Sequence, residues 1–331
     1  DNATAWASAP YSSVRGGTAE GILESPGGSR LQVSDVYKAT TDGFVVARTL
    51  TVLVVGSKEF GFSSRFSLES ASPASARDRE FFMPGVWYLH NAYVPPGALA
   101  GDAGRRHMLI REDRLPLPLA MVRDPATNQT MAMVHRRADG GSFAGENMAR
   151  SMIDGRLRFG ALGFLNAGHL QIAFQYPGTE GDRTYLNPRR AGWGPRHHPL
   201  QAGFAQAYDL RVALGSSLTF AEAVESTWRK AFQEADPEPP DADLDRVYNA
   251  SMDILVHYGR KYHGVPSVPF LVGLPTGEVI DTSSQMGFTG KALPCAALLL
   301  RHALDTGNVL IRRQAEDLVD FWVSQAMNPS G

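Results

Sequence analysis

One Gly-rich stretch of the chain, "GLPTGEVIDTSSQMGFTGK" at 273–291, carries two carboxylates close together, Glu278 and Asp281. Two carboxyl groups can divide general acid and general base work when one is protonated and the other ionised. Hydrolysis of a glycosidic bond needs such a pair flanking the bond. Glu278 and Asp281 are therefore the candidate catalytic residues, and Asp281, Gln285 and Lys291 are the candidate substrate contacts on this stretch.

A simpler interpretation of the same stretch is that it caps the helix that follows it. Thr289, or Ser283 with Ser284, could supply the capping hydroxyl. Capping alone would leave unexplained the glycines, which permit unusual backbone angles and stand at positions 273, 277, 287 and 290. We therefore expect a loop that carries polar groups to a binding site.

A second cluster, "PGVWYLHNAY" at 84–93, places aromatic, amide and imidazole groups within a few residues. Sugars present apolar C–H faces and many hydroxyls, so a stacking aromatic ring beside an amide suits them. Trp87, Tyr88 and Asn91 are therefore predicted substrate contacts. The alternative is a strand edge in the core, which also uses Trp and Tyr.

A third cluster, "REDRLPLPL" at 111–119, brings four mixed charges together before a Leu-Pro run. An ordinary surface salt-bridge cluster would have the same composition. Each proline lacks a backbone donor, so the run cannot lie centrally in a sheet and belongs at an edge or a domain border. Arg111 and Asp113 are the predicted substrate contacts of this cluster.

A fourth cluster, "SMDILVHYGRKYHG" at 251–264, offers a Tyr/His pair in His257 and Tyr258. Such a pair can serve as proton acceptor and donor in β-elimination on a uronic acid. Both residues are therefore added to the predicted substrate contacts. A purely structural role is the alternative for His263, because a histidine near a helix C-terminus interacts favourably with the helix dipole.

Adjacent histidines, His197 and His198, raise the question of a metal site in "NPRRAGWGPRHHPLQ" at 187–201. Neighbouring side chains of an extended chain point opposite ways, and no carboxylates at ligand spacing accompany them. We predict no metal and no other cofactor. An exposed loop is the first expectation here, and binding of an acidic sugar by its arginines is the second.

The elements that would position these clusters change in type near residue 216. Residues 1–215 read as many short strands separated by Gly, Pro, Asn and Asp, which is typical of a large antiparallel β-sandwich. One helical excursion is expected near "SARDREFFMPGVWYLHNAYV" at 75–94, broken early by its Pro-Gly pair. Residues 216–240 predict a linker helix and an acidic, Pro-rich connector, and residues 241–331 predict a helical domain.

The composition of the 331 residues excludes several classes of protein. With 43% hydrophobic and 20% charged residues, the chain is typical of a soluble globular protein. A net charge of −2 with dispersed Lys and Arg argues against a nucleic-acid partner. No apolar run approaches the roughly 20 residues that a membrane span requires. The only cysteine is Cys295, which excludes an intrachain disulfide.

The order of β-sandwich, linking helix and helical hairpins resembles the six-hairpin glycosidase-like carbohydrate-active enzymes, which place a β-supersandwich ahead of an (α/α)6 toroid. The segments that carry the resemblance are "FFMPGVWYLHNAYVPPGA", "REDRLPLPLAMVRDPATNQTMAMVH" and "SSQMGFTGKALPCAALLLRHAL". The resemblance implies a fold of large sandwich plus the start of a helical toroid. It also implies a secreted or periplasmic glycoside hydrolase, with Arg111 and Asp113 on a sandwich loop that closes one side of the pocket.

Two further hypotheses stay open beside the hydrolase. A polysaccharide lyase of related architecture would use the Tyr/His pair on a uronate. A non-catalytic carbohydrate-binding or assembly subunit would dock a partner on its helices. Because the chain holds only about three main helices after its connector, we expect a second chain or a missing C-terminal part to complete the helical domain. The catalytic acid and base of the resembling enzymes commonly lie on later helices.

Overall fold

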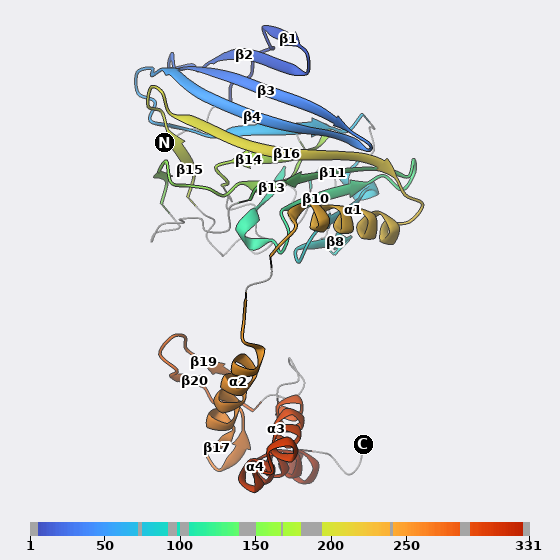
Figure 1. The fold of residues 1–331 in the computed structure, drawn as a ribbon, viewed down its shortest axis with the longest axis vertical. Helices are drawn as coiled ribbons and strands as arrows, with labels where there is room; N and C mark the ends of the chain where they lie inside the picture. The colour runs from blue at the N-terminus through green and yellow to red at the C-terminus, as the bar shows by residue number, and fades with distance from the viewer. Residues whose placement is uncertain are drawn as a thin grey trace. The chain divides into compact units, whose positions relative to one another are not determined.

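The computed structural model divides the chain into two compact units, Asp1–Pro237 and Glu238–Gly331 (Figure 1). We call them the sandwich unit and the helical unit. The residues that the structure describes are 6–71, 75–91, 98–99, 106–138, 150–166, 168–179, 194–238, 241–284 and 292–326.

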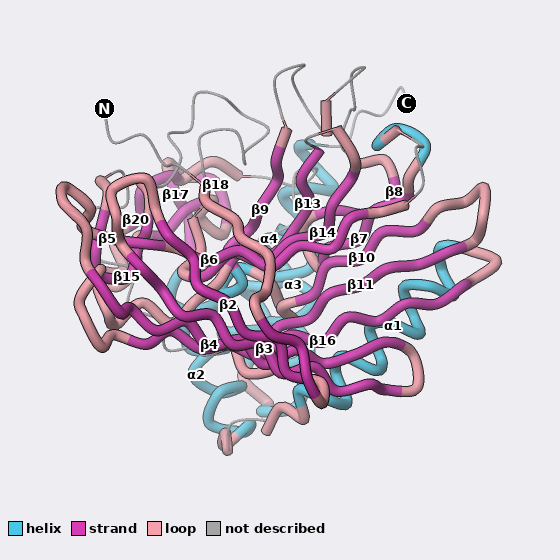
Figure 2. Tube along the Cα trace, turned by 90° about the horizontal axis from the view of Figure 1, so that it is seen from above, coloured by secondary structure: helices cyan, strands magenta, loops and turns pink. Residues whose placement is uncertain are grey.

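The largest sheet of the sandwich unit has nine strands, all paired antiparallel (Figure 2). Their order across the sheet is β1-β2-β3-β4-β16-β11-β10-β7-β8. In that order the strands are Ser13–Arg15, Thr18–Glu24, Arg30–Thr40, Gly43–Val54, Ala205–Ser216, Gln129–His135, Leu119–Arg123, Glu80–Met83 and Trp87–Leu89.

Two smaller sheets complete the sandwich unit. The four-stranded sheet has the order β6 (Ser64–Glu69), β14 (Leu170–Tyr176), β13 (Ala161–Asn166) and β9 (His107–Arg111). The three-stranded sheet has the order β12 (Met152–Ile153), β15 (Arg196–Pro199) and β5 (Gly61–Phe62). Two 3₁₀ turns, Ala76–Asp78 and Glu112–Arg114, precede β7 and β10. These sheets confirm the predicted fold class of this unit, an antiparallel β-sandwich.

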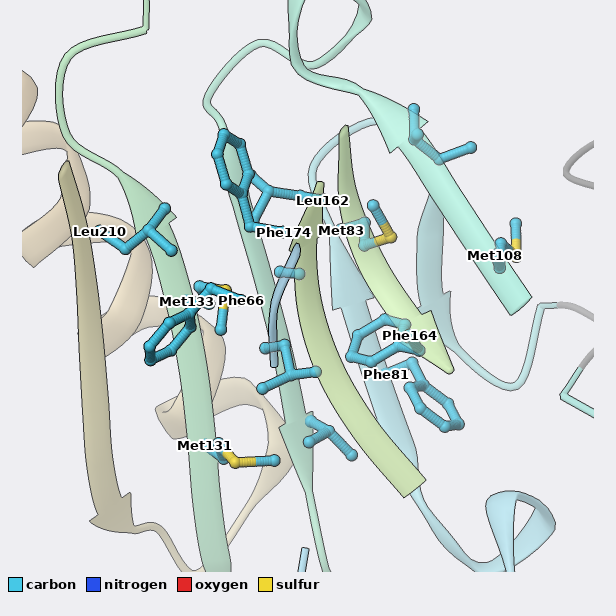
Figure 3. Close-up of a cluster of buried hydrophobic side chains, with 14 of the residues drawn as sticks. Phe66, Phe81, Met83, Met108, Met131, Met133, Leu162, Phe164, Phe174 and Leu210 are labelled. Atoms are coloured by element: carbon cyan, nitrogen blue, oxygen red, sulfur yellow. The ribbon is translucent and has the colours of Figure 1, made fainter. Parts of the chain in front are cut away.

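The sandwich core lies between the nine-stranded and four-stranded sheets, because both sheets send alternate side chains into it (Figure 3). Phe81 of β7 packs against Phe164 of β13 with 4.7 Å between ring centroids. Its neighbour Phe82 points to the opposite face, where it contacts Trp228. Side chains of consecutive residues in a strand point to opposite faces, so Phe81 and Phe82 can each be buried in a different apolar cluster.

The helical excursion expected at 75–94 is wrong. In the described part of this segment, 75–91, only the short turn Ala76–Asp78 is helical, and the chain then forms the β7–β8 hairpin. Gly85 adopts a φ of 73° in the turn, a conformation that favours glycine. Because Phe81 and Phe82 each fill a different apolar layer, a strand buries both, whereas a helix would not.

Helix α1 (Phe220–Ala235) belongs to the sandwich unit and packs on the outer face of the nine-stranded sheet (Figure 1). Thr219 and Glu222 form a reciprocal capping box at its start. Phe220, Val224 and Trp228 pack against the apolar patch on β7, β10 and β11. Phe232, one turn further along the helix, is 52% exposed.

The helical unit contains α2 (Leu244–Tyr258), α3 (Ala292–Thr306) and α4 (Val309–Phe321), followed by a π-turn at Trp322–Ala326. Between α2 and α3 lie two small hairpins, β17 (Arg260–Tyr262) with β18 (Val265–Ser267), and β19 (Leu271–Val272) with β20 (Val279–Asp281). The core of the unit is small: Met252, Ala296, Leu299, Ala315 and Leu318.

The apolar residues of α2 divide between an exposed face and a buried one. Leu244, Val247 and Ile254 are exposed, whereas Met252 faces α3 and α4 with Leu255 beside it. No helix among the described residues is long and apolar enough to cross a membrane. The helices follow the sandwich as predicted, and the toroid itself stays a prediction.

Candidate functional site

The two candidate catalytic carboxylates lie on the β19–β20 hairpin of the helical unit. The backbone N–H of Ser283 donates to Asp281 Oδ1 at 2.8 Å, which fixes the carboxylate in an Asx turn. Hydrogen bonds from the Ser283 side chain and backbone hold the pKa of Asp281 below its usual value. Asp281 is partly exposed, and a carboxylate of this kind is ionised at neutral pH and able to accept a proton or a hydroxyl hydrogen bond.

Glu278 is exposed and directly precedes β20. Its carbonyl accepts from the N–H of Gly273 at 2.8 Å, which closes the hairpin that carries Asp281. The predicted contacts Gln285 and Lys291 lie outside the described residues.

Tyr258 connects the end of α2 to this hairpin, because its hydroxyl donates to the carbonyl of Gly277 at 2.7 Å. The hydroxyl of Tyr262 in turn donates to the carbonyl of Tyr258 at 2.9 Å. His257 is exposed and sets its ring edge-on to Tyr258, with 4.7 Å between centroids. The structure therefore brings His257 and Tyr258 next to the loop that leads to Glu278.

A glutamine from α4 holds the C-terminus of α2. Gln314 Nε2 donates to the carbonyl of Val256 at 2.9 Å and to the carbonyl of Gly259. These are carbonyls that a helix end otherwise leaves without a partner. The side chain thus fixes the helix end from which Tyr258 reaches the β19–β20 hairpin.

The cluster at 84–93 lies in the sandwich unit, and most of its polar groups are used within it. Trp87 is fully buried at 0% exposure, and its ring packs 4.5 Å from Phe81. Tyr88 is 47% exposed, and its hydroxyl accepts from the N–H of Gly85 at 3.0 Å. Asn91 accepts from Tyr88 N and donates to Val86 O. Of the three predicted contacts, Trp87 is buried, whereas Tyr88 and Asn91 are exposed.

Arg111 and Asp113 form an ion pair in which Arg111 Nε donates to Asp113 Oδ1 at 2.9 Å. The guanidinium of Arg111 also stacks over Phe159 at 3.9 Å, and only 2% of the residue is exposed. Arg111 is thus a buried residue, while Asp113 keeps its side chain 22% exposed.

The residue between them, Glu112, is a polar centre that the sequence reading missed. Its Oε2 lies 2.6 Å from Nδ1 of His135, and its Oε1 accepts from the N–H of Gly160. Glu112 and His135 are both at most 4% exposed. In the sequence, Glu112 and His135 each border an apolar strand. No local pattern indicates that two residues 23 positions apart are in contact.

The adjacent histidines have different partners, as the extended-chain argument predicts, but Arg196–Pro199 form strand β15 rather than the expected exposed loop. His198 is 2% exposed; its Nε2 donates to the carbonyl of Leu157 at 2.9 Å, and its Nδ1 accepts from Gln206 at 2.8 Å. His197 Nδ1 lies 3.1 Å from the Ser63 hydroxyl. Burial lowers the pKa of both histidines, so both favour the neutral form. Within the described part of the chain, no group of three or more His, Cys, Asp or Glu side chains could hold a metal.

The predicted site residues therefore fall into two sets. Glu278 and Asp281 lie on the β19–β20 hairpin, and Tyr258, next to His257, is hydrogen-bonded to the turn of that hairpin at Gly277. Trp87, Tyr88 and Asn91 share the β7–β8 hairpin, and Arg111 with Asp113 follows β9. The sandwich set is mainly engaged in packing and internal hydrogen bonds, so the helical unit offers the more accessible polar groups.

No protein-family model matches the chain, and no curated protein matches it. A galactose mutarotase-like protein from Lactobacillus casei ATCC 334 is similar at 14% identity and a TM-score of 0.31, covering 60% of this chain and 69% of that one. The Slr1438 protein from Synechocystis sp. PCC 6803 is similar at 10% identity and a TM-score of 0.27, covering 64% of this chain and 66% of that one. Likeness at this level is too weak to assign a family or an activity.

Proposed function

We propose that the chain is part of a carbohydrate-active enzyme, a glycoside hydrolase that works by carboxylate acid/base catalysis. The observation that carries the proposal is the state of Asp281. Its side chain is partly exposed, held in one orientation by Ser283, and kept ionised by hydrogen bonds that lower its pKa. An oriented, ionised carboxylate on a loop between helices is what the base or nucleophile of a glycosidase requires.

The direction of the pKa shift favours one role for Asp281. A general acid must be protonated at working pH, which requires a raised pKa. Asp281 has the opposite shift, so it is the base or nucleophile, and the proton must come from another carboxyl group. Glu278, three residues earlier, is the candidate for that acid on this chain.

The lyase hypothesis ranks second because of the tyrosine hydroxyls. Tyr258 and Tyr262 both donate to backbone carbonyls, at 2.7 and 2.9 Å. A tyrosine that exchanges a proton with a uronate would first have to give up such a bond. The hydrolase therefore needs less rearrangement of this loop than the lyase does.

The test is the substitution Asp281→Asn with Ser283→Ala as its matched control. Asn keeps the size of Asp281 and removes its basicity, so kcat on a responsive oligosaccharide falls by about 10²–10⁴-fold. Ser283→Ala keeps the backbone N–H that orients the carboxylate but removes the side-chain bond. It retains most of the turnover and moves the acid limb of the kcat/KM profile to higher pH, because the pKa of Asp281 rises.

The assay is release of reducing ends across a panel of neutral and acidic glycans, with near-ultraviolet absorbance followed in parallel. Unchanged turnover and unchanged sugar affinity in Asp281→Asn would remove this residue from the site. Growth of near-ultraviolet absorbance on uronate polymers would assign the lyase instead. Sugar binding without turnover by the complete protein would favour the binding subunit.

A further inference from the structure

A pocket of about 210 Å³ lies within the helical unit, between the β17–β18 hairpin and helix α4. Leu318, which is 1% exposed, and Pro266 form its apolar lining, together with Leu310. Leu310 is 80% exposed, so the pocket has an open apolar wall as well as a closed one. This volume is below the roughly 300–1,000 Å³ of pockets for drug-sized ligands, which limits an occupant to a small molecule.

The charged groups around this pocket are mostly cations. Arg260, Lys261 and Arg313 line it, and Asp317 is the only acid that does. In the described part of the chain, none of these three cations forms an ion pair. The neighbouring Arg312, by contrast, pairs with Glu316 at 2.8 Å on the same helix. The three cations at the pocket therefore outnumber the one carboxylate among its described lining residues, Asp317.

The end of α2 beside the pocket does not account for these charges. A helix C-terminus carries about half a negative charge, far less than three cations supply. Its last carbonyls already accept hydrogen bonds from neutral donors. Gln314 donates to Val256 and Gly259, and Tyr262 donates to Tyr258. Arg260 makes a 3.3 Å contact from Nε to the Tyr262 hydroxyl, which leaves its terminal N–H groups for another acceptor.

We infer that this pocket binds a small organic oxyanion, a carboxylate- or phosphate-bearing molecule of monosaccharide size. Arg313, Arg260 and Lys261 supply the charge-assisted donors that such a group prefers. Leu310 and Pro266 supply the apolar surface on which the C–H face of a sugar ring rests. The site does not depend on the assignment of Asp281, which lies on a different hairpin.

The experiment is a titration of the isotope-labelled whole chain, followed by amide chemical shifts, with D-glucuronate and D-glucose 6-phosphate as probes. D-Glucose is the neutral control. The expected result is saturable shifts at residues 259–267 and 310–318 with at least one anionic probe. Arg313→Gln weakens that binding about tenfold, as loss of a charged hydrogen bond does. Lys261→Gln, on the opposite wall, weakens it in the same direction.

Arg312→Gln is the matched control, because it removes a guanidinium one position away that already has a partner. It leaves the affinity within about twofold. Binding of glucuronate alone assigns a carboxylate ligand, and binding of the phosphate ester alone assigns a phosphorylated one. The proposal is overturned if neither anion gives saturable shifts, if glucose binds as well as they do, or if Arg312→Gln weakens binding as much as Arg313→Gln.

Discussion

The two units of the molecule use their apolar residues in opposite ways. The sandwich unit buries large side chains completely: Trp87, Phe81 and Phe164 are 0–1% exposed. Two of the five buried core residues of the helical unit are alanines, Ala296 and Ala315. It leaves Leu244 75% exposed and Leu310 80% exposed. Burial of apolar area stabilises a fold roughly in proportion to the area. The sandwich unit is thus the stable scaffold, and the helical unit keeps apolar surface available for other contacts.

The comparison is tested most strongly by truncating one core residue in each unit. Trp87→Ala removes a large ring from a rigid, well-packed site and costs about 3–5 kcal/mol of unfolding free energy. Leu299→Ala in the helical unit costs about 2–3 kcal/mol, because a small core can collapse around the vacancy. Denaturant unfolding of the full chain, with tryptophan fluorescence and circular dichroism as separate probes, measures both. An equal or larger loss in Leu299→Ala would show that the helical core is as tightly packed as the sandwich.

A buried ion pair provides the second test, within the sandwich unit. Asp35 is 0% exposed, and its Oδ1 accepts from Arg48 Nε at 2.7 Å. Asp35→Ala leaves that guanidinium without its carboxylate and costs about 3 kcal/mol, since removal of one partner strands a buried charge. Glu225→Ala breaks the exposed pair with Arg229 on α1 and costs at most about 0.5 kcal/mol. Similar losses of unfolding free energy in both variants would mean that burial does not determine how much these ion pairs contribute to stability.

The smallest expected effect is a pH dependence that belongs to the sandwich unit. Burial lowers the pKa of His198 below 6.5, so the folded state resists a proton that the unfolded chain accepts. The associated stability is complete above about pH 6.5 and is lost as the pH falls below it. The loss is at most about 1.4 kcal/mol per pH unit for this residue. His198→Gln flattens the acid side of the stability profile measured by urea unfolding between pH 7 and 5. An unchanged slope would assign the dependence to other groups, with His197 first.

The strands and helices could be predicted well because their signals are local. Alternation of apolar and polar residues marks β6, β14 and β16, and the Thr219 capping box marks the start of α1. The buried side of α2 could not be predicted, because an apolar stripe does not say which of its faces a neighbour will cover. Leu244 and Ile254 are exposed, whereas Met252 is buried against α3 and α4.

The candidate site could be predicted only in part, for a similar reason. The polar hairpin with Asp281 was recognised, because its residue types and glycines lie together in the sequence. Trp87 looked accessible beside His90 and Asn91, yet pairing of β7 with β8 turns it into the core. The contact between Glu112 and His135 depends on strand pairing that no local pattern encodes. Residues joined by tertiary contacts over long separations are those that sequence reasoning misses.

The hydrogen bond from Gln314 to the end of α2 can form only after α4 has been synthesised. Its two residues are 58 positions apart, so at a synthesis rate of about 5–20 residues per second α4 is made about 3–12 s after α2. During that interval the carbonyls of Val256 and Gly259 lack the donor that Gln314 later supplies. The pocket beside Arg313 does not yet exist, because the wall that α4 forms has not been synthesised. The helix end and the pocket are therefore completed by the same element, α4.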